Sequence, residues 1–241
     1  TFISSKTISP ILSTICTKLL DKYPFIKGIA NNIQPINDNL IFGEDTHIIY
    51  GRSYINELFC GLKFRISTAS FFQINIIQAE NAVRYIVEYI STTSICNRII
   101  DAYSGIGTIS LPLAFLGVEM IAIELNPEAH STAINNAKLN NISNILFIRS
   151  SVPDFLSGNL NHDDLLILDP PRKGLDIHTL NTILEKKPIK IIYMSCNYST
   201  LARDLSVILE NSLYKIYSFA AFDFFPQTTH LETICILELN I

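Results

Sequence analysis

From Arg98 to the C-terminus, short β-branched, apolar runs alternate with longer segments that have helical spacing. This alternation predicts βαβ units, whose right-handed crossovers build a parallel sheet with helices on its faces. There are too few such units for the eight of a TIM barrel. The last two runs are close enough in the chain to form an antiparallel pair. The predicted strands are Ile99–Asp101, Met120–Ile123, Ile145–Arg149, Leu165–Asp169, Ile189–Ser195, Tyr214–Ala221 and Leu231–Leu239, and the predicted helices are Thr108–Leu116, Pro127–Leu139, Asp176–Leu184 and Ser199–Leu209.

The chain before this region has a different texture. A helix is predicted from Ile11 to Tyr23, where Pro24 ends it, and a second, apolar-striped helix ends near Ile90. Between them lie short β-rich runs, such as Leu40–Phe42, separated by Asn, Asp and Gly turns. We therefore expect a partial β-rich subdomain over residues 1–66, with a small antiparallel sheet between Phe25 and Ile66, and an α/β catalytic domain over residues 67–241. Without an initiator Met, the sequence is expected to begin inside a longer protein.

The composition of the chain argues against several classes of protein. No apolar run approaches the ~20 residues of a membrane span, and the five cysteines contain no Cys-x-x-Cys pair. This pattern favours neither a zinc or iron–sulfur site nor a disulfide framework, so we expect a reduced, cytoplasmic protein without a metal. The formal net charge is −4. A nucleic-acid substrate would therefore need a local basic patch or a further segment of chain to contact it.

A glycine turn follows the first predicted strand of the sheet. In Asp101–Thr108 two glycines allow a tight turn and close backbone approach to a ligand, but Ser110 replaces the third glycine of a dinucleotide fingerprint. Glu124 ends the next strand, where a carboxylate can accept both hydroxyls of an adenosine ribose. The pair favours S-adenosylmethionine over NAD and predicts a Rossmann-like, class I methyltransferase sheet. The alternative for Glu124 is a surface side chain at a strand end.

Two further strand ends carry candidate residues. In Asp169-Pro170-Pro171 the prolines rigidify the turn and would hold Asp169 at the edge of the sheet, although a loop-closing aspartate is the alternative. Ser195-Cys196-Asn197 ends another strand and precedes a helix, with Ser199 or Thr200 as the expected N-cap. The positive end of that helix should lower the pKa of Cys196 and favour the nucleophilic thiolate. The alternative is a small buried hydrophobe, as most free cysteines are.

Five blocks, in this order, resemble the RNA (uracil-carbon-5)-methyltransferases, the bacterial enzymes that form 5-methyluridine in 23S rRNA and tRNA. The glycine turn is generic, whereas the Ser-Cys-Asn block and the final Phe-Pro block are specific. The resemblance runs from about Pro24 to the C-terminus, and Asn39–Ile66 is more similar to the rRNA branch. The blocks are Ser70–Asn75, Asp101–Thr108, Asp169–Gly174, Ser195–Asn197 with Thr200–Asp204, and Phe225–Glu232.

The resemblance implies roles for single residues. Cys196 would be the nucleophile that adds to carbon 6 of uracil, and Glu232 the base that removes the hydrogen at carbon 5. Burial should raise the pKa of Glu232 to suit that task. Thr108 stands where relatives often have Asn, and Ser151 is a looser match to a cofactor contact. The S-adenosylmethionine pocket would be lined by Gln73, Tyr103, Thr108, Glu124 and Asp169.

The sequence also departs from the family pattern. Tyr198 replaces the usual proline after Ser-Cys-Asn, and neither the N-terminal RNA-binding β-barrel nor the iron–sulfur cysteines of some members are found.

Our main hypothesis is a monomeric enzyme that methylates carbon 5 of a uridine in 23S rRNA. The alternatives are a tRNA substrate, a non-catalytic remnant that binds S-adenosylmethionine or RNA, and a methyltransferase for a small molecule or protein. The last is disfavoured because methylation at N or O needs no covalent nucleophile.

Overall fold

The computed structural model describes residues 1–5, 10–35, 43, 45–68, 70–93, 96–210 and 214–240. The chain divides into two compact units. The first comprises Thr1–Glu57 with Phe64–Phe71, and the second comprises Leu58–Lys63 with Phe72–Ile241. No helix of the described part is long and apolar enough to cross a membrane.

The first unit holds a small sheet of order β1-β2-β3 and one helix. β2 and β3 are antiparallel as predicted. β1, a strand that the sequence analysis did not predict, pairs parallel to β2; α1 lies between these two strands in the chain, and a parallel pair needs such a connection. The predicted strand Leu40–Phe42 lies outside the described residues. The elements are β1 (Phe2–Ser4), α1 (Pro10–Lys22), β2 (Gly28–Ile33) and β3 (Asp45–Gly51).

A two-stranded hairpin of β4 (Tyr54–Phe59) and β5 (Leu62–Ser67) follows. Its turn residues Cys60 and Gly61 both have positive φ, +49° and +75°, which is the conformation that two-residue hairpins favour. The Cys60 amide donates a hydrogen bond of 2.7 Å to the Glu80 carboxylate on α2 (Ile76–Thr92).

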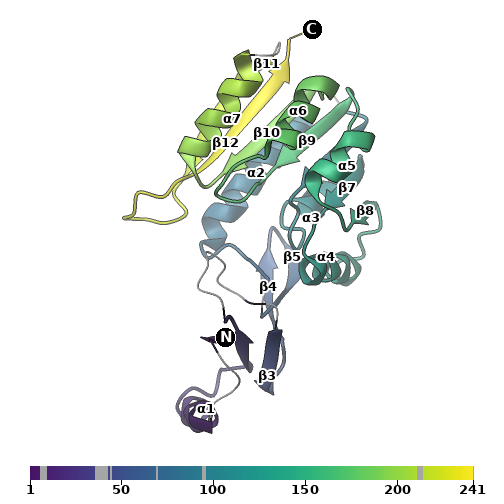
Figure 1. Cartoon of the computed structure of the whole chain (residues 1–241). Coiled ribbons are helices and arrows are strands. Elements are labelled where there is room, and N and C mark those ends of the chain that lie inside the picture. The colour runs from purple at the N-terminus through teal and green to yellow at the C-terminus, as the bar shows by residue number, and fades with distance from the viewer. Residues whose placement is uncertain are drawn as a thin grey trace. The chain divides into compact units, whose positions relative to one another are not determined.

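The second unit is built on a seven-stranded sheet of order β11-β12-β10-β9-β6-β7-β8 (Figure 1). The central strands run parallel, and β12 runs antiparallel to both β10 and β11, which confirms the predicted arrangement. The strands are β6 (Arg98–Ala102), β7 (Glu119–Ile123), β8 (Ile145–Ile148), β9 (Asp164–Leu168), β10 (Lys190–Ser195), β11 (Tyr214–Phe222) and β12 (Glu232–Leu239).

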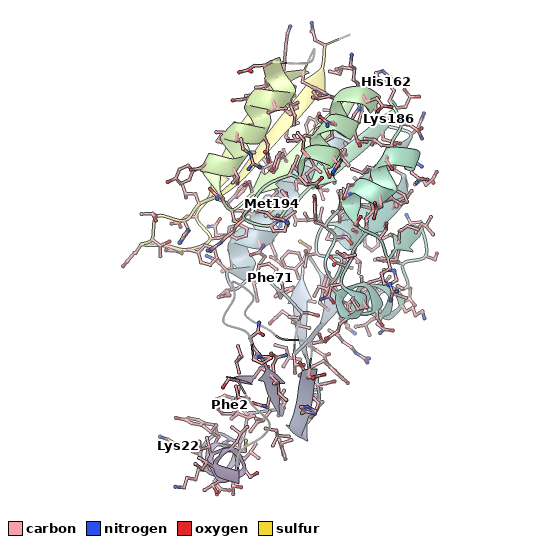
Figure 2. All side chains as sticks on the ribbon, viewed as in Figure 1. Phe2, Lys22, Phe71, His162, Lys186 and Met194 are labelled. Atoms are coloured by element: carbon pink, nitrogen blue, oxygen red, sulfur yellow. The ribbon has the colours of Figure 1, made fainter. Side chains whose placement is uncertain are left out.

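Helices cover both faces of this sheet. α5 (Val152–Asn159), α6 (Ile177–Lys186) and α7 (Tyr198–Glu210) lie on one face, and α2 passes behind the sheet in Figure 1. The apolar sides of α5, α6 and α7 pack on alternate strand residues, because successive strand side chains point to opposite faces. Figure 2 shows Met194, near the end of β10, at the opposite end of the sheet from His162 and Lys186.

Two helices differ from the prediction. The helix expected over Thr108–Leu116 is a short α3 (Ser110–Leu113) followed by a 3-10 turn, Ala114–Leu116, since the glycine turn extends further than expected. α5 was missed because it is short, although Ser151 caps it by accepting a hydrogen bond from the Asp154 amide. α4 (Pro127–Leu139) matches its predicted range.

Candidate active site

The ends of β6, β7 and β9 meet at one edge of the second unit's sheet. Ala102 is in register with Ile123 on one side and Leu168 on the other. The residues that follow these strand ends, Tyr103, Glu124 and Asp169, therefore emerge at the same edge. This is the edge at which parallel α/β sheets bind ligands.

The glycine turn presents backbone amides at this edge. Tyr103, Gly105 and Gly107 have φ of +70°, +56° and +91°, a region that only glycine enters without strain. The Glu124 carboxylate accepts hydrogen bonds from the Gly105 amide at 2.9 Å and from the Asn126 amide at 2.5 Å. Glu124 is thus held against the turn rather than projecting freely from a strand end.

Asp101 is a site residue that the sequence analysis did not single out. It is fully buried, and one carboxylate oxygen accepts a hydrogen bond from the Ser110 hydroxyl. The other oxygen, like the buried hydroxyl of Ser104, has no partner among the described residues. Burial raises the pKa of Asp101 to about 7, and the charges of Asp169 and Glu124 act in the same direction. Its position as the acidic residue before the glycine turn was the signal that could have identified it.

The side chains of the other residues predicted to line the cofactor pocket are not shown by their contacts to face this edge of the sheet. The Tyr103 ring packs against the hydrophobic core beneath α5, α6 and α7, and its hydroxyl forms a hydrogen bond with the Thr179 side chain. Only the backbone of Tyr103 therefore takes part in the glycine turn. Gln73 and Thr108 are half-buried. Ser151 is occupied as the N-cap of α5.

The antiparallel pairing of β10 with β12 brings the two predicted catalytic residues together. Ser195 is in register with Thr233, and the Thr233 hydroxyl donates to the Ser195 carbonyl at 3.1 Å. Cys196, one residue beyond Ser195, therefore stands beside Glu232, one residue before Thr233. The Ser195 hydroxyl closes a tight turn around Cys196 by accepting from the Asn197 amide at 3.1 Å.

The electrostatics at Cys196 correct the predicted lowering of its pKa. The thiol is partly buried, and this burial raises its pKa; the charges of Glu232 and Asp169 raise it further. The Arg172 guanidinium opposes them, by its charge and by a hydrogen bond with the thiol. Burial first, and then the two neighbouring acids, therefore raise the pKa of Cys196, where the sequence analysis predicted a lowered value.

The two acids beside Cys196 are themselves perturbed. Glu232 is 3% exposed, and burial, with the charge of Asp169, raises its pKa to about 8, as predicted in direction. Burial raises the pKa of Asp169 to about 7. Both groups can therefore hold a proton near neutral pH, as a general base that must later release it requires.

The site fits a ligand that carries positive charge. Asp101, Glu124, Asp169 and Glu232 are coupled in a chain of like charges, and two buried polar atoms beside the glycine turn have no hydrogen-bond partner within the described ranges. A sulfonium or ammonium group would offset the like charges, and an ammonium could also donate hydrogen bonds to the unpartnered oxygens. No cluster of His, Cys, Asp and Glu in the described ranges is arranged to hold a metal.

The start of α7 differs from the prediction. The helix begins at Tyr198, so Asn197 is its N-cap and accepts from the Ser199 amide at 3.0 Å, in place of the expected Ser199 or Thr200. Tyr198 occupies the first helical position, where proline is most favoured. The replacement of the usual proline by Tyr198 therefore leaves the helix start intact, and the tyrosine is 66% exposed.

The sequence model of a family described as tRNA (uracil-5-)-methyltransferase matches residues 37–164 and 158–240. The chain belongs to this family. It is 51% identical over 238 residues to an uncharacterized RNA methyltransferase of Prochlorococcus marinus, a match that covers 99% of the chain and 57% of the relative. It is 40% identical over 230 residues to one of Enterococcus faecalis, covering 94% and 50%. The chain thus spans about half the length of these curated relatives.

A solved structure is similar to this chain. It is the tRNA (uracil-54, C5)-methyltransferase of Pyrococcus abyssi in complex with S-adenosyl-L-homocysteine, with a TM-score of 0.74 and 30% identity over 90% of this chain and 52% of that one. Trm5b from the same organism, at 14% identity and a TM-score of 0.66 over 99% of this chain and 72% of that one, supports the fold alone. The second unit therefore has the Rossmann-like fold of S-adenosylmethionine-dependent methyltransferases.

Proposed function

We propose that this chain carries the catalytic centre of an S-adenosylmethionine-dependent methyltransferase that modifies carbon 5 of a uridine in RNA. The observation that supports this most strongly is the juxtaposition of Cys196 and Glu232 through the β10–β12 register, beside Asp169. Methylation at nitrogen or oxygen needs neither a nucleophilic thiol nor a second base. Methylation at carbon 5 of uracil needs both.

Glu124, Asp169 and the glycine turn would hold the cofactor, with Gln73, Tyr103 and Thr108 as further lining residues. Glu124 would accept ribose hydroxyls while its carboxylate stays anchored to the turn. Asp101 and Asp169 would face the positive charge of the ligand. When bound, S-adenosylmethionine supplies an electrophilic methyl group.

Cys196 would add as thiolate to carbon 6 of the flipped uracil, forming a C–S bond and making carbon 5 nucleophilic. Once carbon 5 is methylated, Glu232 would take its remaining proton, and the electron pair left behind would expel the Cys196 thiolate. The raised pKa of Glu232 suits this proton transfer because the carboxylate is a stronger base than an exposed one.

We propose 23S rRNA as the substrate because Asn39–Ile66 is more similar to the rRNA-modifying branch of the family. A tRNA substrate is the alternative. The test incubates the protein and S-adenosylmethionine with 5-fluorouridine-substituted 23S rRNA fragments or tRNA and looks for a covalent adduct on a denaturing gel. Fluorine cannot leave as a proton does, so the adduct should accumulate. The RNA that is trapped identifies the substrate.

Three variants separate the roles. Cys196→Ala should abolish the adduct, whereas Cys60→Ala, at a half-buried cysteine of the β4–β5 turn, should retain it. Glu232→Gln should accumulate adduct even with unsubstituted RNA, because elimination is blocked. Calorimetry in parallel should show S-adenosylmethionine binding that Glu124→Ala weakens at least about tenfold. Cofactor binding without adduct on either RNA contradicts the proposal and favours a non-catalytic remnant.

A further inference from the structure

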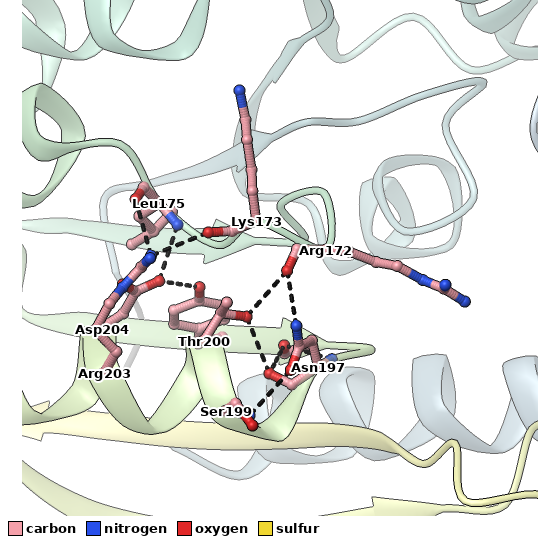
Figure 3. Close-up of polar contacts among 10 residues, drawn as sticks. Arg172, Lys173, Leu175, Asn197, Ser199, Thr200, Arg203 and Asp204 are labelled. Atoms are coloured by element: carbon pink, nitrogen blue, oxygen red, sulfur yellow. Dashed lines mark hydrogen bonds and ion pairs between the residues drawn. The ribbon is translucent and has the colours of Figure 1, made fainter. Parts of the chain in front are cut away.

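The turn that follows Asp169 is bonded to the start of α7 (Figure 3). The carbonyl of Arg172 accepts two hydrogen bonds, from the Asn197 side-chain amide at 3.0 Å and from the Thr200 hydroxyl at 3.2 Å. Both donors lie within four residues of Cys196. The backbone of Arg172 is therefore fixed to the same short segment that carries the candidate nucleophile.

Asp204 is the centre of a second set of bonds to this turn. Its carboxylate is fully buried and accepts from the Leu175 amide at 2.8 Å, the Tyr193 hydroxyl at 2.6 Å and Arg203 Nε at 2.8 Å. The Arg203 guanidinium in turn donates to the carbonyls of Lys173 and Leu175 at 3.1 and 3.2 Å. One buried carboxylate thus joins the turn, β10 and α7.

The turn packs tightly against Arg203 and Asp204 at Gly174. A Cβ added at Gly174, whose φ is +75°, would lie 2.6 Å from both the Arg203 guanidinium and the Asp204 carboxylate. The glycine lets the backbone rest directly on Asp204 and Arg203. The turn can therefore shift only if these bonds break.

The Arg172 side chain leaves the turn away from these bonds, and in a different direction from Lys173 (Figure 3). It interacts with the Cys196 thiol, where the other charged groups facing the sulfur are the carboxylates of Glu232 and Asp169. Arg172 is thus the cation that opposes two anions at the candidate nucleophile. Displacement of the guanidinium would weaken both its charge–charge attraction and its hydrogen bond to the sulfur, because both fall with distance and with rising solvent content.

We propose that Asp204 is a positioning residue for Cys196: it holds the Arg172–Leu175 turn on α7 so that the Arg172 guanidinium stays against the sulfur and stabilises the thiolate. This rests on the proposed function of Cys196 as the nucleophile. Neither Asp204 nor Arg203 touches the reacting atoms. Their effect passes through the backbone of the turn.

The test measures the pH dependence of iodoacetamide alkylation at Cys196, read by mass spectrometry on the tryptic peptide Ile191–Arg203. Arg172→Gln should move the alkylation midpoint upward by about one pH unit. Asp204→Asn should also move it upward. Loss of the Asp204 charge by itself would move the midpoint downward, so the sign separates positioning from simple electrostatics.

The double variant and a control complete the experiment. Arg172→Gln combined with Asp204→Asn should give the midpoint of Arg172→Gln alone, because the second change acts through the first residue. Asp164→Asn removes another buried aspartate, paired with Arg98 at 2.7 Å at the far end of β9, and should leave the midpoint unchanged. An unshifted or lowered midpoint for Asp204→Asn, or additive shifts, overturns the proposal.

If Asp204→Asn does not fold, Thr200→Val tests the same idea. It keeps the side-chain shape but removes the hydroxyl that donates to the carbonyls of Arg172 and Asn197. A smaller upward shift is therefore expected, and an unchanged midpoint refutes the positioning role. The assay contains neither RNA nor cofactor. Its failure is therefore distinguishable from a failure of the proposed function, which the fluorouridine adduct reports.

Discussion

Replacement of Glu232 by Gln should make the protein more stable, and increasingly so as the pH rises. In the folded state burial and the charge of Asp169 raise the pKa of Glu232 to about 8, whereas the unfolded chain has the ordinary carboxyl value. Below that ordinary value both states hold the proton, so the native glutamate and the glutamine are equivalent in charge. As the pH rises, the unfolded glutamate releases its proton first, and the native protein loses stability until the pH passes the folded pKa.

The magnitude follows from the linkage between protons and folding. One pKa unit corresponds to about 1.4 kcal/mol. Allowing for partial ionisation near pH 8, the unfolding free energy of Glu232→Gln relative to the native protein should increase by about 2 kcal/mol between pH 6 and pH 8. This is an upper estimate because water can enter the site when the carboxylate ionises.

The assay is urea unfolding followed by circular dichroism, since the chain has no tryptophan to report by fluorescence. Glu210→Gln, at the exposed end of α7, shows what the loss of one surface carboxylate does under the same conditions. A stability difference for Glu232→Gln that stays constant between the two pH values, or that falls, would refute the assignment of a buried, proton-holding glutamate.

Two further predictions concern the turns. Asp169→Asn removes a charge that raises the pKa of Cys196, so the alkylation midpoint of that thiol should move to lower pH; a higher midpoint would mean that Asp169 does not face the sulfur. Gly107→Ala places a Cβ 2.0 Å from the Leu111 side chain at φ +91° and should destabilise the fold by about 1–3 kcal/mol. Gly158→Ala, where a Cβ meets nothing within 4 Å on a helix, should be neutral or stabilising by up to about 1 kcal/mol. Thermal melts compare the two, and equal melting temperatures would contradict the strain argument.

Local patterns were enough to predict most of the second unit. The alternation of apolar runs and helical segments gave the parallel strands, and the short connection before the last strand indicated its antiparallel pairing, which the register confirms. The short helix α5 was not predicted because eight residues show little hydrophobic periodicity. The parallel β1–β2 pair was not predicted because the pairing of strands in a small sheet depends on contacts between residues that are distant in sequence.

The sequence by itself determined that Glu124, Asp169 and Cys196 stand at strand ends, because strand ends are encoded locally. It could not set the pKa of Cys196. That pKa depends on the burial of the thiol and on Glu232, which is 36 positions further along the chain and is brought beside the sulfur by the β10–β12 register. Electrostatic energy follows distance in space and burial, and both of these are properties of the assembled sheet.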